Sequence, residues 1–221
     1  MSMENNQSQR GSAIPRTQVR RLPHLAVQDR EQMLAVLHAG KIAHVGIVDA
    51  DEPRVLPMAY APAGDSSLLL HGSTASQLSR RMATGASVCV TVTLLDGLVV
   101  SNSSFEASMN YRCVMVFGHG TEVPATDKLE ALRTLSEHLF PHRWPEFIAP
   151  TDQQLKATCL IRIPLDEMSM KTRTGPALDS PEDHSVQRWS GVVPMQMTFG
   201  EPIADPHVQV PAPEYINRWL P

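Results

Sequence analysis

The segment from Leu70 to Arg81, LHGSTASQLSRR, gathers residue types that bind anionic groups. A predicted strand ends here, a glycine follows, and hydroxyl side chains precede a predicted helix that carries two arginines. Glycine allows close backbone approach, the first N–H groups of a helix lack partners, and guanidinium groups pair with phosphate oxygens. The pattern therefore suits a phosphate monoester. Ordinary capping by Ser or Thr and a solvated arginine pair explain the same residues without a ligand.

Three further side chains have the chemistry of a binding or catalytic site. His71 is either a hydrogen-bonded structural residue or a proton donor, since histidine titrates near neutrality. Arg112 lies in an apolar strand and needs an anionic partner, either a carboxylate of the protein or a cofactor phosphate reached across a subunit boundary. Trp189 offers a flat ring for stacking on a planar cofactor or for packing. The nine histidines show no HExxH spacing, so we expect no metal ion.

Charge and cysteine content argue against several classes of protein. A formal net charge of -4 leaves no basic excess for a nucleic acid, and no apolar run reaches the roughly 20 residues that span a bilayer. Cys89, Cys113 and Cys159 lie singly in apolar segments without a CxxC pair, which is typical of core residues in a reducing compartment. We therefore expect a cytoplasmic protein with neither a nucleic-acid nor a membrane partner.

The sequence predicts short strands with a few helices between them. Asp29 with Gln32 predicts a helix start, and Gly40 predicts its end. Thr151 with Gln154 predicts a second capping box. Helices are expected at 30–39, 75–84, 127–139 and 152–158, and strands at 42–48, 54–61, 68–71, 87–95, 98–100, 111–118, 159–164 and 168–172.

Short polar turns between neighbouring strands indicate antiparallel pairing, and the elements together predict a barrel decorated with helices. Closure of the barrel or dimerisation would cover the apolar strand edges. We expect a disordered tail at residues 1–22 and a barrel domain at 23–174. Residues 175–221 are expected to form a C-terminal extension that packs on the barrel or on a dimer partner.

Five segments in order resemble the flavin-binding split-barrel proteins of the pyridoxamine 5'-phosphate oxidase type, most closely the branch with nitroimidazole-resistance proteins. They are LLLHGSTAS from Leu68, VTVTLLDGLVVS from Val90, SMNYRCVMVFG from Ser108, KTRTGP from Lys171 and WSGVVP from Trp189. The likeness extends from about His24 to Tyr215. It implies a mainly β fold with α, a six-stranded antiparallel split β-barrel with peripheral helices. It also implies a homodimer with FMN at the subunit interface.

The resemblance assigns roles to individual residues. Arg54, Met58 and Tyr60 would line the flavin ring and ribityl chain, and His71 would lie close to the cofactor and the small-molecule substrate as the candidate proton donor. The other implied contacts are Gly72, Ser73 and Thr74 along the ribityl chain, Ser76, Gln77, Arg80 and Arg81 around the phosphate, and Arg112, Lys171 and Trp189 from the partner subunit or the pocket rim.

Two departures from the family pattern lie near the expected cofactor. A basic residue usually stands where this chain has Gln77, and a pair of histidines where it has Glu106 and Ala107. Three functions therefore stay open. They are an FMN-dependent oxidoreductase acting on a small planar or nitro-aromatic substrate, a non-catalytic protein that binds flavin or haem, and a cofactor-free enzyme of specialised metabolism. For haem, His71, His119 and the methionines are the candidate axial ligands.

Overall fold

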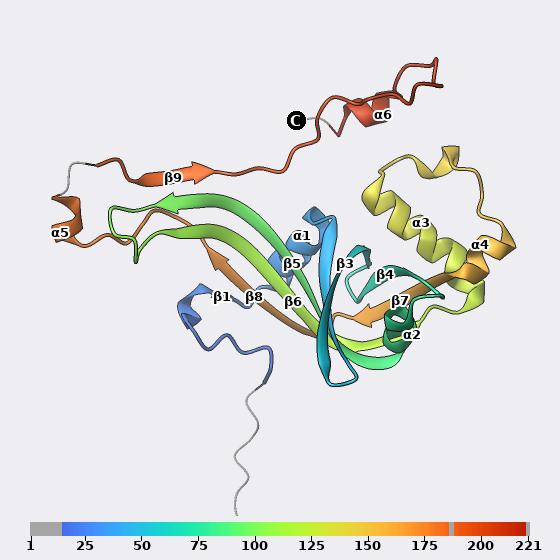
Figure 1. The fold of residues 1–221 in the computed structure, drawn as a ribbon, viewed down its shortest axis with the longest axis horizontal. Helices are drawn as coiled ribbons and strands as arrows, with labels where there is room; N and C mark the ends of the chain where they lie inside the picture. The colour runs from blue at the N-terminus through green and yellow to red at the C-terminus, as the bar shows by residue number, and fades with distance from the viewer. Residues whose placement is uncertain (1–14, 186–187, 220–221) are drawn as a thin grey trace, which may run out of the picture.

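The computed structural model describes residues 15–185 and 188–219. Six strands close into a ring in the order β6, β7, β4, β3, β2, β5 and back to β6 (Figure 1). Every pairing in the ring is antiparallel, so the predicted six-stranded antiparallel barrel is confirmed. The ring strands are β2 (Ile42–Asp49), β3 (Glu52–Ala63), β4 (Ser67–Ser73), β5 (Thr84–Val100), β6 (Ser108–Glu122) and β7 (Thr158–Pro164).

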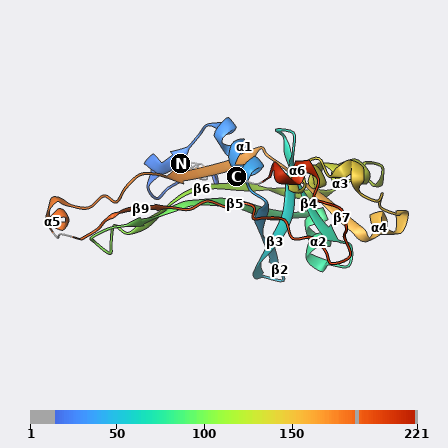
Figure 2. The ribbon, with the colours of Figure 1, turned by 90° about the horizontal axis from the view of Figure 1, so that it is seen from above.

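Strands β5 and β6 run on beyond the ring and form an arm (Figures 1 and 2). We predicted two strands at 87–95 and 98–100, but a register shift between Leu95 and Gly97 bends one continuous strand. Further strands pair with the edges of this arm. They are β8 (Glu167–Arg173) along β6, β1 (Ala26–Val27) along β8, and β9 (Gly191–Pro194) along the end of β5.

The helices begin where the capping residues predict. The Asp29 carboxylate accepts from the N–H groups of Glu31 and Gln32, and Thr151 forms the expected capping box with Gln154. The α-helices are α1 (Arg30–Ala39), α2 (Gln77–Ala83), α3 (Lys128–Leu139), α4 (Asp152–Ala157), α5 (Pro181–His184) and α6 (Glu214–Asn217). Single 3-10 turns lie at Pro23–Leu25, Ala125–Asp127 and Trp144–Glu146.

The core has two parts, one on each side of the wall formed by β4. Leu68 and Leu70 pack in the barrel interior, whereas Leu69 packs with Leu135 and neighbouring residues of α3 outside it. Successive strand residues point to opposite faces, so three consecutive leucines are buried only because both faces of β4 are covered. Helix α3 therefore seals this side of the barrel.

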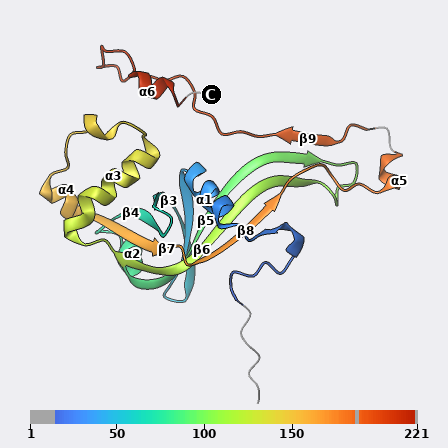
Figure 3. The ribbon, with the colours of Figure 1, turned by 180° about the vertical axis from the view of Figure 1, so that it is seen from behind.

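The segments at both ends of the described chain are held by polar contacts. Residues 15–22 fall within the tail that we expected to be disordered, yet Arg16 makes a bidentate ion pair with Glu167 at 2.7 and 2.9 Å. After β9 the chain passes above the barrel to α6 (Figure 3). There the Tyr215 hydroxyl donates to Glu146 at 2.8 Å, so the C-terminal extension contacts the rest of the chain both at β9 and at Tyr215.

His138 joins α3 to the end of α1. Its Nε2 lies 2.8 Å from the carbonyl oxygen of Gly40, and its own carbonyl oxygen accepts from Lys41 at 2.7 Å. Burial, reinforced by the charge of Lys41, lowers the pKa of His138 to about 4. The neutral ring is therefore the form that the fold stabilises.

We expect His138 to make stability depend on pH. Its contribution is complete above the ordinary histidine pKa of about 6.5 and is lost as the pH falls toward the folded value, because the unfolded chain then binds the extra proton. Urea unfolding of the wild type at pH 7 and pH 5 should show a loss of about 1 kcal/mol that His138→Gln removes. His207→Gln, at an exposed position, is the control. Equal pH dependence in the wild type and His138→Gln would contradict the assignment.

Candidate functional site

The loop after β4 is held by its own hydroxyl groups. Ser73 Oγ accepts from the N–H of Ala75 at 3.1 Å, and Ser76 Oγ caps α2 by accepting from the N–H of Ser79 at 3.2 Å. The Thr74 hydroxyl donates to the carbonyl oxygen of the residue before β7 at 3.0 Å. The hydroxyls predicted to bind phosphate therefore also build the loop, and Ser73 stays exposed.

Arg80 is the arginine of this segment whose guanidinium is available to an anionic ligand. Its guanidinium donates to the carbonyl oxygen of Thr74, and in the described part of the chain it has no carboxylate partner. Gln77, at the start of α2, is also exposed, and it lies about one helical turn before Arg80. The structure thus brings Thr74, Gln77 and Arg80 to one exposed corner.

Arg81 and Arg54 are both paired with carboxylates. Arg81 Nη1 lies 2.8 Å from Asp49 Oδ1, and Arg54 Nη2 lies 3.0 Å from Glu52 Oε2. Asp49 and Glu52 are register partners at the turn between β2 and β3, so the two ion pairs stand side by side. Each arginine would have to share or leave its carboxylate before it could bind a phosphate.

Gly72 and His71 occupy opposite faces of β4. A Cβ atom at position 72 would clash with the Ser79 side chain, so this glycine lets α2 pack closely on the strand. His71 is exposed on the side of Leu69 and pairs in register with Leu160. Partial desolvation lowers the pKa of His71, which favours the neutral form of its ring.

Tyr60, which was predicted to line the flavin, has its side chain in the core of the barrel. It is fully buried, and its hydroxyl donates to the carbonyl oxygen of Leu37 at 2.6 Å. Burial raises the pKa of this phenol well above its ordinary value. Met58, two residues earlier on β3, is half-buried and packs against the main core.

The other three predicted residues lie on the arm or on the segment before β9. Arg112 forms a bidentate ion pair with Asp96 at 2.9 and 2.7 Å, which favours the structural interpretation of that arginine. Lys171, on β8, donates to the carbonyl oxygen of Arg21 at 3.1 Å. Trp189 is 66% exposed. A single chain therefore does not bring these three residues to the corner formed by the loop after β4.

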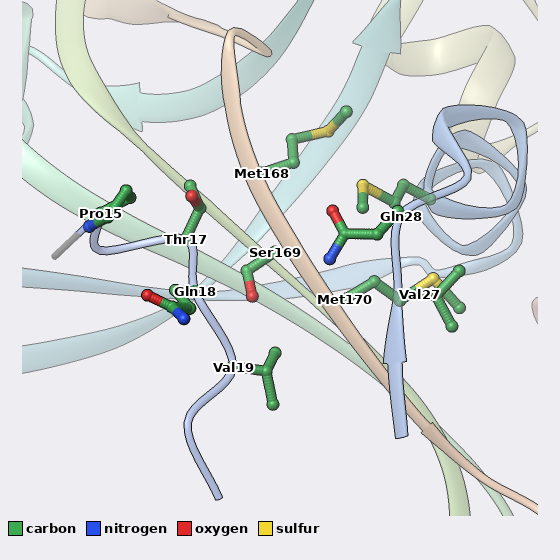
Figure 4. Close-up of a pocket in the computed structure, with 10 residues that line it drawn as sticks. Pro15, Thr17, Gln18, Val19, Val27, Gln28, Met168, Ser169 and Met170 are labelled. Atoms are coloured by element: carbon green, nitrogen blue, oxygen red, sulfur yellow. The ribbon is translucent and has the colours of Figure 1, made fainter. Parts of the chain in front are cut away.

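A pocket that sequence reasoning missed lies between the N-terminal segment and β8 (Figure 4). Its volume is about 240 Å³, and no titratable side chain is among its lining residues. The sequence does not predict it, because the polar composition of residues 1–22 is typical of a disordered tail, whereas Pro15, Thr17, Gln18 and Val19 form one wall. Such a lining suits a small neutral molecule better than acid–base chemistry.

Within residues 15–185 and 188–219, no three His, Cys, Asp or Glu side chains gather closely enough to hold a metal ion. No helix in these ranges is both long and apolar enough to cross a bilayer.

The sequence matches the family described as pyridoxamine 5'-phosphate oxidase over residues 29–172, most of the barrel domain. The chain belongs to the pyridoxamine 5'-phosphate oxidase family. Two solved structures of the same fold are similar over nearly their whole length. The FAD and haem binding protein from Mycobacterium smegmatis is 32% identical with a TM-score of 0.85, covering 89% of this chain and 97% of that one. The flavocytochrome Anf3 from Azotobacter vinelandii is 34% identical with a TM-score of 0.86, covering 92% and 95%.

The likeness to nitroimidazole-resistance proteins is weaker. The structure of a candidate 5-nitroimidazole antibiotic resistance protein from Bacteroides thetaiotaomicron is 21% identical with a TM-score of 0.54, covering 66% of this chain and 85% of that one. This likeness shows the fold alone and does not place the chain in that branch of the family. A search of the curated proteins finds no match.

Proposed function

We propose that this protein binds a flavin nucleotide and a haem, and transfers electrons between them, as a homodimer. The observation that carries the proposal is the pair of near-full-length structures at 32% and 34% identity, one an FAD and haem binding protein and the other a flavocytochrome. Of the three functions left open by the sequence, these similarities favour the flavin- or haem-binding protein over an oxidoreductase of nitro-aromatic substrates. FMN and FAD are both candidates for the flavin.

The corner formed by Thr74, Gln77 and Arg80 fits a flavin phosphate. The exposed guanidinium has donors to spare beyond its bond to Thr74, and no carboxylate in the described ranges competes for it. A guanidinium–phosphate contact is a charge-assisted hydrogen bond. His71, in its neutral form, would offer the flavin one N–H donor or one acceptor nitrogen.

The outer face of the barrel fits a second copy of this chain. Along β2 and β3, Ile42, Val48 and Val55 are 55%, 57% and 66% exposed. Exposed apolar side chains gathered on one sheet face are typical of interfaces between subunits. The family resemblance assigns Arg112, Lys171 and Trp189 to the partner subunit or the pocket rim, and a single chain does not bring them to the corner of Thr74, Gln77 and Arg80.

Bound flavin and haem together would supply two-electron and one-electron redox chemistry. The chain's own part is to hold the phosphate through Arg80, to bury the rings between subunits and to keep His71 as a neutral hydrogen-bonding group.

The absorption spectrum of the purified protein tests the proposal. We expect flavin bands and a Soret band, each regained when the stripped protein is titrated with flavin or haemin. Flavin at about a hundredfold excess over its Kd should raise the free energy of unfolding by about 2.7 kcal/mol. A colourless protein that takes up neither group would refute the proposed function.

Removing the Arg80 charge should weaken binding of flavin phosphates only. We expect Arg80→Gln to raise the Kd for FMN or FAD about tenfold or more and to leave the Kd for riboflavin unchanged, because only the phosphate contact is lost. Fluorescence titration measures all three ligands. The matched control is Arg133→Gln on α3, at an exposed arginine 3.9 Å from Glu130. An equal loss for riboflavin would mean that Arg80 merely supports the loop.

A charge on the outer face should separate the subunits. We expect Val55→Asp to shift the mass measured by light scattering from dimer to monomer, since a buried unpaired carboxylate is costly. Leu129→Asp, on α3 and 48% exposed, is the control that should leave the mass unchanged. If the Val55→Asp protein stays dimeric, the subunit interface does not include this face of β2 and β3.

A further inference from the structure

The segment that follows β9 is exposed to solvent at every position. We call residues 195–212 the strap. Its side chains Met197, Ile203 and Val210 are 91%, 96% and 71% exposed, and the strap contributes to neither part of the described core. A Cβ atom added at Gly200 would meet no described atom from elsewhere in the chain within 4 Å. The chain therefore leaves the apolar side chains of the strap uncovered.

The chain on either side of the strap contacts the rest of the molecule (Figures 1 and 3). Before it, β9 pairs with β5, and the N–H of Met195 donates to the carbonyl oxygen of Asp96 at 3.0 Å. After it, the Tyr215 hydroxyl of α6 donates to Glu146. These contacts hold the strap near the barrel, although the strap itself does not pack on it.

The contacts of the strap itself are few and local. Asp205 accepts from the N–H groups of His207 and Val208, at 3.0 and 2.9 Å, and the Phe199 ring lies 5.9 Å from the Trp219 ring. Residues 200–204 make no hydrogen bond within the ranges that the structure describes. These contacts cover little of the apolar surface of the strap.

Proline limits the conformations of the strap. A proline fixes its own φ and favours extended backbone in the residue before it, and the strap has prolines at Pro202, Pro206 and Pro211. A segment with fewer conformations loses less entropy when it binds a partner. The strap is therefore suited to packing against a protein surface along its extended path.

The surface of the chain is much larger than that of a compact monomer. It measures 15136 Å², whereas a compact protein of 24.3 kDa exposes about 10,000 Å². The residues outside the described ranges account for at most about 2,800 Å² of the difference, the surface of an unfolded chain of their mass. The remaining excess of about 2,000 Å² in each chain is enough for a stable homodimer, since obligate interfaces bury roughly 2,000 to 5,000 Å² in total.

The charge and composition of the strap narrow the kind of partner. Glu201 and Asp205 are its only residues with a formal charge, and it has no lysine or arginine. Anionic membranes and nucleic acids are bound through lysine and arginine, so neither fits the strap. Methionine and aromatic residues, which the strap has at Met195, Met197 and Phe199, are enriched in interfaces between proteins.

We propose that the strap packs on a second copy of this chain, so that each subunit of the homodimer clasps the other. This inference rests on the proposed function, which supplies the homodimer, and it names a segment that holds the two copies together. Most homodimers have twofold symmetry, in which both copies make the same contact. Both straps would then bury their apolar side chains at once.

Photo-crosslinking of the full chain tests the assignment. Benzoylphenylalanine in place of Ile203 should join two chains on illumination, because this position would lie against the second copy. A denaturing gel then shows a covalent dimer, and mass spectrometry of the crosslinked peptides identifies the surface that receives the strap. The same substitution at Leu129, an exposed residue of α3, is the control and should give no covalent dimer.

A charge on the strap should weaken the dimer without disturbing the fold of the subunit. We expect Ile203→Asp to raise the dimer dissociation constant about tenfold or more in analytical ultracentrifugation, because a carboxylate would be buried without a partner. Its circular dichroism spectrum should match the wild type, since Ile203 is exposed in the single chain. Leu129→Asp is the control and should dissociate as the wild type does.

The outcomes separate this inference from the proposed function. A dimeric Ile203→Asp protein with wild-type affinity, or crosslinks that form only within one chain, would overturn the assignment of the strap and leave the proposed function standing. A wild-type protein that is monomeric at all concentrations would overturn both the strap and the homodimer. Flavin and haem binding would still be decided by the absorption spectrum.

Discussion

The antiparallel pairing of β5 with β6 is the constraint on which the rest of the structure depends. This one ladder closes the ring of six strands, and its continuation past the ring forms the arm that β8 and β9 join. A ring has no free edge, so closure satisfies backbone groups that an open sheet would expose. The same ladder carries the Arg112–Asp96 ion pair on the arm and the His119–Gly85 contact at its other end.

The helices complete the barrel by covering different parts of it. Helix α3 buries the outer side of β4, and α2 approaches the same strand so closely that only glycine fits at position 72. On β2 and β3, in contrast, Ile42, Val48 and Val55 stay exposed. The outer side of β4 is therefore covered by the chain itself, whereas β2 and β3 expose apolar side chains.

Electrostatic pairing within the chain decides which basic groups remain for a phosphate. Arg54, Arg81 and Arg112 each have a carboxylate partner, and a surface ion pair of this kind adds little stability but occupies both charges. Arg80 is bonded to a backbone carbonyl instead. The loss of a basic residue at Gln77 therefore concentrates the proposed phosphate contact on one side chain.

The sequence by itself determined the local elements, because caps and alternation act over a few residues. Asp29 and the Thr151 box marked helix starts, apolar alternation marked the strands, and the ordered segments indicated the family. Only the tertiary structure decided which side chains are free to bind. Tyr60 bonds to Leu37 and Arg112 to Asp96, and because these contacts join different elements, no local pattern shows them.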